Sequence, residues 1–233
     1  LEVYQLFLYS VMHNIIYHMN KLCTFLLLTV LIGRDLNQSL QIAGDNSLDI
    51  KKAMSSVPLN QSKGMQWLIT HMPSEDLQNV KAEFLLLNSD IAHHARENTK
   101  WGQEIPEDLF FSYVLPYANL NETVESWRLD FFNKFYPMVK DMPSAYDAVV
   151  LLNQKIFDEL GVIYSTKRPK ADQSPYESIN AGMASCTGLS ILLIDVCRSV
   201  GIPARFVGTP SWYNNSGNHS WVEIWDGEWH FTG

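Results

Sequence analysis

The sequence predicts an α+β fold, in which a helical N-terminal region precedes a part that contains β-strands. Two observations predict it. From about residue 48 to residue 160, apolar side chains recur at helical spacing, in runs that proline or glycine interrupts. After residue 203 the pattern changes to the alternation that is typical of half-buried strands. Helices that precede strands, rather than alternate with them, favour an α+β domain.

The composition is that of a folded protein. The chain has 233 residues, of which 46% are apolar and 18% charged, enough for one large domain or two small ones. The net charge is −8 and there is no run of Lys or Arg, which argues against a nucleic-acid partner. No set of Cys and His residues has the spacing of a zinc site, so we expect no metal.

The first 45 residues are expected to form a signal-like leader and a linker. Residues 19–21 give a short basic end, and residues 22–32 form an apolar run, as in a secretory signal. The run is too short to span a bilayer comfortably. Residues 34–46 are polar and weakly patterned, which favours a linker. We therefore expect export directed by residues 19–33, with no stable membrane span after the leader is removed. An uncleaved leader that anchors the chain is the alternative.

Residues 46–142 are expected to form the helical region. The longest clear helix is predicted over residues 80–98, and an aromatic-rich helix over residues 127–139. The aromatic stripes are interpreted as core rather than as a cofactor pocket. Residues 143–233 are expected to form the second part, which opens with a helix that Ser144 caps and that ends at Gly161.

A cysteine occupies the first turn of the most sharply delimited helix. Residues 184–190 form a small-residue turn that leads into a helical run, and Gly201 and Pro203 end that run. Unpaired N–H groups and the helix dipole favour an anion at this end, so Cys186 is easier to ionise there. A buried structural cysteine is the alternative. Cys197 lies too far along the same helix for a disulfide with Cys186, and we expect it to be a buried free thiol.

A histidine follows at the start of a predicted strand. Residues 204–209 and 218–225 are predicted to be strands, and a turn at residues 226–227 leads into a returning strand. His219 begins the second strand, where its side chain can reach a neighbouring helix end, and imidazole is the usual base for a thiol nucleophile. A strand-edge histidine without a catalytic role is the alternative, and His230 is a weaker candidate.

The order of these parts resembles the core of the transglutaminase-like superfamily. The resemblance rests on the cysteine at a helix start, on Gly-Ile-Pro-Ala-Arg at residues 201–205 and on His-Ser-Trp-Val-Glu at residues 219–223. It implies a papain-like arrangement in which the Cys-bearing helix packs on an antiparallel sheet, truncated here at the C-terminus. It also implies that Cys186 is the nucleophile and His219 the base. The helical N-terminal region suggests exported bacterial members.

The resemblance places an orienting acid four residues after Trp229, and that position is Gly233. The acid is therefore missing, substituted or supplied beyond Gly233. Asp226 lies on the hairpin tip and is expected to point away from the site. Glu223 lies on the same strand face as His219 and could approach it.

An oxyanion hole is also required for acyl transfer. The backbone N–H of Cys186 is one donor by position, and the side chain of Gln173 is a candidate for the second. Trp101 and Trp212 are further candidates that the sequence does not rank.

Two functions follow from these observations. The first is a thiol acyl-transfer enzyme, a protease, amidase or transamidase that acts on a protein, peptide or amide-containing substrate through a thioester and needs no cofactor. The second is a catalytically impaired domain that binds protein or polymer through an aromatic face made of Trp212, Tyr213, Trp221 and Trp225. The acyl acceptor and the oligomeric state stay open.

Overall fold

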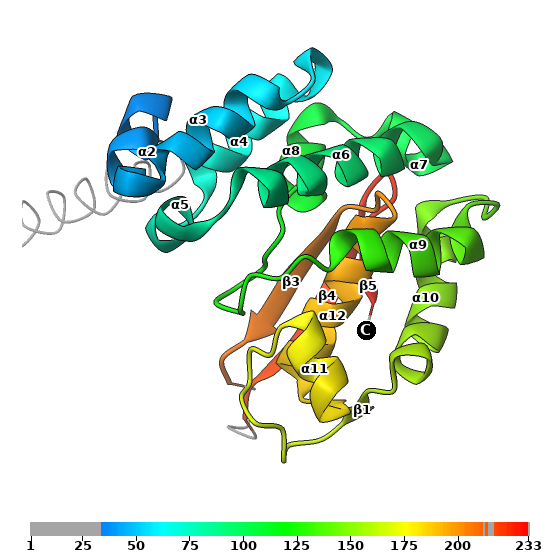
Figure 1. The fold of residues 1–233 in the computed structure, drawn as a ribbon. Helices are drawn as coiled ribbons and strands as arrows, with labels where there is room; N and C mark the ends of the chain where they lie inside the picture. Colours follow the sequence, from blue (N-terminus) through cyan, green and yellow to red (C-terminus); the bar gives the residue numbers. More distant parts are fainter. Residues whose placement is uncertain (1–33, 212, 214–216, 233) are drawn as a thin grey trace, which may run out of the picture.

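The computed structural model describes residues 34–211, 213 and 217–232. It confirms the α+β class: a helical N-terminal region lies beside a unit in which helices pack with a small antiparallel sheet (Figure 1). The helical region contains α2 (Leu36–Ala43), η1 (Gly44–Asn46), α3 (Ser47–Ser56), η2 (Leu59–Gln61), α4 (Ser62–His71), α5 (Ser74–Asn79), α6 (Ala82–Asn98), α7 (Lys100–Glu104) and α8 (Glu107–Tyr113). The second unit contains α9 (Arg128–Val139), α10 (Ala145–Leu160), β1 (Ile163–Tyr164), α11 (Pro175–Ala181), β2 (Met183–Ala184), α12 (Cys186–Ser199), β3 (Ala204–Thr209), β4 (His219–Trp225) and β5 (Trp229–Thr232).

Residues 34–46 do not form the predicted linker, because α2 and η1 occupy most of them. Asp35 starts α2 with a capping box: its carboxylate accepts a hydrogen bond from the Gln38 N–H, and the Gln38 side chain accepts one from the Asp35 N–H. Ala43 is buried in the core of the helical region, and Leu40 packs against that core. The apolar face of α2 is short and the stretch is polar overall, so the sequence pattern did not indicate this helix.

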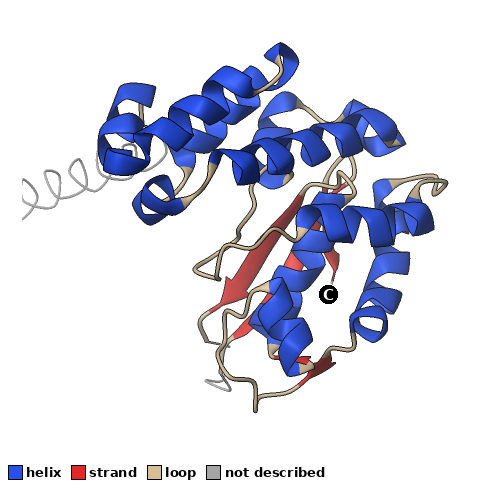
Figure 2. Ribbon diagram, viewed as in Figure 1, coloured by secondary structure: helices blue, strands red, loops and turns tan. Residues whose placement is uncertain are grey.

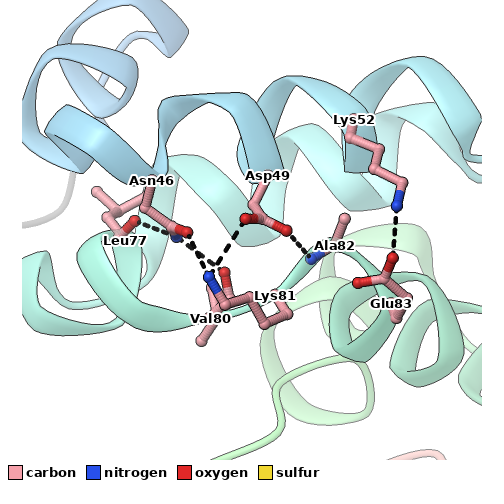
Figure 3. Close-up of polar contacts among 8 residues, drawn as sticks. All are labelled: Asn46, Asp49, Lys52, Leu77, Val80, Lys81, Ala82 and Glu83. Carbon is pink, nitrogen blue, oxygen red and sulfur yellow. Dashed lines mark hydrogen bonds and ion pairs between the residues drawn. The ribbon is translucent and has the colours of Figure 1, made fainter.

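The turn between α5 and α6 is held by side chains that begin on η1 and α3 (Figure 3). Asn46 donates hydrogen bonds from Nδ2 to the carbonyls of Leu77 and Val80, at 2.9 and 2.8 Å. The Asp49 carboxylate accepts a hydrogen bond from the Ala82 N–H at 3.1 Å, at the first turn of α6. The first N–H groups of a helix have no acceptor within the helix. Asp49 supplies an acceptor for one of them at the start of α6.

The second unit is built on a sheet with the strand order β3-β4-β5, in which both pairs are antiparallel (Figure 2). Ala204 pairs with Ile224 at one end of the β3–β4 ladder, and Thr209 pairs with His219 at the other. Val222 and Ile224 point to the core, where they are buried in the same cluster as the apolar face of α12. The predicted packing of the Cys-bearing helix on an antiparallel sheet is thus confirmed. A second, parallel pair, β1–β2, was not predicted.

The helix α9 belongs to the core of the second unit, although the predicted division at residues 142–143 puts it with the helical region. Trp127, Phe131, Phe135 and Val139 are buried in one cluster with side chains of α10, α12 and the sheet. The separate cluster of the helical region runs from Ala43 to Tyr117. Apart from Trp101, which α7 contributes to the core of the second unit, the change from one hydrophobic core to the other falls between Tyr117 and Trp127.

Two buried arginines bind the backbone where the chain crosses between the two cores. Arg128 donates hydrogen bonds to the Asn88 side chain and to the carbonyls of Val114, Leu115, Pro116 and Arg198. Arg198 donates to the carbonyls of Tyr113, Pro116, Ala118 and Ala204. Buried carbonyl groups need donors, and the chain between α8 and α9 takes many of its donors from these two side chains.

The leader predicted over residues 19–33 lies outside the described residues, and export stays a prediction. Within the described ranges, no helix combines the length and the apolar character that crossing a bilayer requires. Cys186 and Cys197 are both free thiols, and Cys197 is buried, as the sequence predicts.

Candidate active site

Cys186 is the first residue of α12, and a close contact seats this end of the helix. Gly188 faces Ala184 of β2, and a Cβ atom at position 188 would lie only 2.9 Å from the Ala184 Cβ. A larger residue would push the first turn of α12 away from β2. The backbone N–H of Cys186 has no partner within the helix, so a negative charge on the sulfur or on a bound substrate is favoured there.

His219 begins β4, at the end of the ladder where Thr209 is its partner on β3. The His219 side chain is exposed, and its ring stacks on Trp221 with centroids 6.1 Å apart. Alternation along the strand places Ser220 on the opposite face, toward α12, and Ser220 is buried. The Ser220 hydroxyl lies 3.4 Å from the Thr187 hydroxyl on the first turn of α12.

Two cavities meet at the cysteine, and both are lined by Cys186, His219 and Ser220. The larger has a volume of about 460 Å³ and extends along the β3–β4 side to Phe206 and Leu120. The smaller, about 160 Å³, lies between α10, α12 and β4, and apolar side chains line much of it: Phe157, Leu189, Leu193 and Val222. The structure thus brings the two predicted site residues to the same pair of cavities.

Two opposing effects set the pKa of the Cys186 thiol. Partial burial disfavours the thiolate and by itself raises the pKa. Hydrogen bonds from the hydroxyl and N–H of Ser220, and from those of Thr187, favour the thiolate and outweigh the burial, so the pKa lies below its ordinary value. Burial raises the pKa of the Cys197 thiol instead. The two thiols of α12 are therefore opposite in character, and Cys186 is the one that ionises more readily.

Removal of the Ser220 hydroxyl is expected to raise the pKa of Cys186, because one of the groups that stabilise the thiolate is lost. In Ser220→Ala, alkylation of Cys186 by iodoacetamide at neutral pH should slow by a few fold, measured by mass spectrometry of the peptide that carries Cys186. Ser190→Ala is the matched control, because Ser190 lines the smaller cavity but does not bond the thiol. Equal rates in wild type and Ser220→Ala would show that this hydroxyl does not set the thiol's reactivity.

The two acidic residues considered as orienting groups are engaged elsewhere. Glu223 lies directly across from Arg205, whose guanidinium bonds its carboxylate at 2.6 and 2.8 Å. Asp226 accepts a hydrogen bond from the Tyr146 N–H at the start of α10, at 3.0 Å, and so points away from His219 as predicted. Gly233 lies outside the described residues. In the part of β5 that the structure describes, Thr232 is the last residue and pairs with Val222, short of His219.

The structure does not support Gln173 as the second oxyanion donor. Gln173 is buried and lines neither cavity, and its Nε2 donates to the carbonyls of Glu177 and Met183 at 3.3 and 3.2 Å. Trp101 is also excluded, because its indole N–H donates to the Val200 carbonyl at 3.0 Å within the core. Trp212 lies outside the described residues.

Three side chains near the cysteine were missed by the sequence analysis. Ser220 and Thr187 supply donors to the thiol, and Arg168 donates from Nε to the Ser185 hydroxyl at 2.8 Å, one residue before Cys186. The role of Ser220 could have been found from strand alternation, since it neighbours His219 and faces the helix. Arg168 lies on a loop, and nothing in its sequence context indicates its contact.

Comparison with models of protein families agrees with this architecture. Residues 136–231 match the family model of the transglutaminase-like superfamily. Comparison with curated proteins gives no match. A solved structure described as "a Putative Cysteine Protease from Cytophaga hutchinsonii" matches with 19% identity and a TM-score of 0.44, over 57% of this chain and 44% of that one. This chain therefore spans less than half the length of that protein.

The family match confirms the resemblance that the sequence motifs indicate. The segment from residue 136 to residue 231 is a transglutaminase-like core, in which Cys186 starts the helix and His219 starts the adjoining strand.

Proposed function

We propose that the chain is a thiol acyl-transfer enzyme in which Cys186 is the nucleophile and His219 the base. The observation that carries the proposal is the shared position of the two side chains, which line the same two cavities at the start of α12. The lowered pKa of Cys186 supports it, because the thiolate is the attacking species. The substrate class is a protein, a peptide or another carboxamide.

The first half of the proposed reaction forms a thioester. His219 takes the proton of the Cys186 thiol. The sulfur attacks the carbonyl carbon of the substrate, a C–S bond forms, and the carbonyl π electron pair moves to the oxygen. The Cys186 N–H faces the region where this oxyanion develops. The oxyanion then collapses, the C–N bond breaks, and the protonated imidazole of His219 gives its proton to the departing nitrogen.

The second half returns the enzyme to its starting state. Water or an amine attacks the thioester carbon while His219 takes its proton, and the sulfur leaves as the thiolate. Attack by water gives a protease when the scissile bond is a peptide bond, or an amidase when it is a side-chain amide. Attack by an amine gives a transamidase. All three use the same groups on this chain.

The test combines covalent capture with three product assays. A peptidyl vinyl sulfone should add once to the protein, at Cys186, and the adduct should be absent in Cys186→Ala and much slower in His219→Ala. Incubation with casein and a fluorescent amine then distinguishes the three reactions. A protease produces peptide fragments, an amidase releases ammonia, and a transamidase produces fluorescent casein. Capture at Cys197, or capture that His219→Ala leaves unchanged, would contradict the proposal.

The alternative is a binding module that keeps the fold without catalysis. Two observations favour it: the two acids considered as orienting groups, Glu223 and Asp226, are bound by Arg205 and by the Tyr146 N–H, and Tyr213 and Phe231 are largely exposed. Loss of an orienting group reduces the rate of such an enzyme strongly but leaves its geometry in place. Binding to casein that Cys186→Ala retains, without any product in the three assays, would support this alternative.

A further inference from the structure

A short segment crosses from the helical region to the wall of the candidate active site. Residues 117–122 follow α8, and Leu120 lines the larger cavity together with Cys186 and His219. The carboxylate of Glu122 folds the segment into a tight turn by accepting hydrogen bonds from the N–H groups of Asn119 and Leu120. The Asn119 side chain then reaches α12, where its Nδ2 donates to Asp195 Oδ1 at 2.9 Å.

Two buried oxygen atoms at this contact have no hydrogen-bond partner. They are Oδ1 of Asn119 and Oδ2 of Asp195, one on each side of the hydrogen bond that joins the two residues. Asp195 has no exposed surface. A buried carboxylate with a single hydrogen bond would be costly, and a buried amide oxygen without a donor adds to that cost.

The nearby arginines do not supply the missing donors. Arg128 donates to backbone carbonyls and to Asn88, and Arg198 donates to backbone carbonyls. Among the described residues, neither arginine forms an ion pair or a hydrogen bond with Asp195.

We propose that Asp195 carries a proton and pairs with Asn119 as a carboxylic acid with a carboxamide, which holds Leu120 in the wall of the Cys186 cavity. The Oδ2–H of Asp195 then donates to Asn119 Oδ1, while Asn119 Nδ2 donates to Asp195 Oδ1. One proton thus satisfies both orphaned atoms and leaves no net charge on the pair.

The electrostatic surroundings are consistent with a neutral acid. Burial raises the pKa of Asp195 well above its usual value, and the negative charge of Glu122 raises it further. The positive charges of Arg198 and Arg128 and the hydrogen bond from Asn119 act in the opposite direction and do not cancel the burial. Cys197, the other titratable neighbour on α12, is neutral because burial raises the pKa of its thiol.

The acid–amide pair is tested first by Asp195→Asn, which keeps the shape and can form the same two hydrogen bonds. At pH 7 the Tm of this variant should lie no more than about 2 °C below that of wild type, whereas loss of a buried carboxylate that balanced the arginines should lower Tm by about 10 °C. Difference infrared spectra of wild type minus Asp195→Asn should show the carbonyl band of a protonated carboxylic acid. A large fall in Tm, or a carboxylate band in place of the acid band, would each overturn the proposal.

The pH dependence of stability gives a second test. Below the pKa of an unfolded aspartate, about 3.9, Asp195 is protonated in both states. Above it the unfolded state releases the proton and the folded state keeps it, so this residue makes wild type lose stability as pH rises. Asp195→Asn lacks that loss, so its Tm relative to wild type should increase from pH 4 to pH 7. A relative Tm that falls over this range would show an ionised Asp195.

The effect on the cavity rests on the proposed function and is tested separately. Asn119→Ala should slow capture of Cys186 by the peptidyl vinyl sulfone about ten-fold, because Leu120 loses its anchor, and leave alkylation by the much smaller iodoacetamide within two-fold, both numbers being order-of-magnitude expectations. Relative to wild type at the same pH, Asn119→Asp should recover capture at low pH, when both acids can be protonated. Equal slowing of both reagents would contradict the positioning role. If wild type captures no probe, the proposed function fails, but the infrared and Tm tests still decide the acid–amide pair.

Discussion

Replacement of Cys186 by alanine is expected to reduce kcat/KM for peptide or carboxamide hydrolysis by about 10⁴-fold or more, because the atom that forms the thioester is removed. The loss should fall on kcat, since the cavities that bind the substrate keep their other walls. His219→Ala should cost a similar factor, and the double variant should be little worse than either single one, because the two groups act as a unit.

Cys197→Ala is the matched control for Cys186→Ala. Both cysteines lie on α12 and both are free, but Cys197 is buried away from the cavities. The control should keep nearly full turnover, with a modest loss of stability from a smaller core side chain. If Cys197→Ala abolishes turnover while Cys186→Ala retains it, the nucleophile has been misassigned.

Replacement of Arg128 by alanine is expected to have the largest effect on stability. The guanidinium is almost fully buried and donates five hydrogen bonds, four of them to backbone carbonyls near the junction of the two cores. Its removal takes a donor from five acceptors and leaves a cavity. The Leu115, Pro116 and Arg198 carbonyls keep a donor each, from Asn88, Arg198 and the Gly201 N–H, whereas the Val114 carbonyl and the Asn88 side-chain oxygen lose theirs. A buried acceptor without a donor costs about 1–3 kcal/mol, so together with the cavity we expect a total loss of about 4 kcal/mol. Denaturant unfolding followed by circular dichroism measures it directly.

Lys52→Ala is the matched control, because it removes a cationic side chain that lies on the surface rather than in the core. Lys52 forms an ion pair with Glu83 on the surface, where water screens the interaction, and its removal should leave the unfolding midpoint almost unchanged. Arg128→Lys should recover little of the loss, because one ammonium group cannot reach all of the carbonyls that the guanidinium spans. A loss below about 1 kcal/mol in Arg128→Ala would show that the carbonyls find other donors.

The local signals in the sequence predict the second unit well. Gly201 adopts a positive φ of 79° beyond the end of α12, and Gly161 does the same with 68° at the end of α10, as their positions after apolar runs indicate. Ser144 caps α10 through the Asp147 N–H. The strands predicted over residues 204–209 and 218–225 match β3 and β4 almost to the residue. These features depend on neighbours in the chain, which is why the sequence reveals them.

The features that the sequence did not predict depend on partners far along the chain. Asn119 bonds Asp195, and Arg128 bonds the Arg198 carbonyl, across distances in sequence that no local pattern records. The placement of α9 in the core of the second unit likewise follows from packing against α12 rather than from its own periodicity. The α2 helix is the exception, because its capping box at Asp35 and Gln38 was visible in the sequence.

The same division holds for the candidate site. Cys186 and His219 could be chosen because one starts a helix and the other starts a strand, positions that sequence patterns reveal. Gln173 was chosen only for lying upstream on a loop, and the structure turns its amide toward the Glu177 and Met183 carbonyls. Donors to an oxyanion or a thiolate depend on the direction of a single N–H or O–H bond, which composition and periodicity do not fix.

The most direct test of the central claim is the rate at which iodoacetamide alkylates Cys186 as a function of pH, compared in the folded protein and in denaturant. The folded thiol is expected to reach half of its maximal rate at a lower pH than the unfolded thiol, since Ser220 and Thr187 stabilise the thiolate. A midpoint at or above that of the unfolded thiol would contradict it, because Cys186 would then be an ordinary or buried cysteine rather than an activated nucleophile.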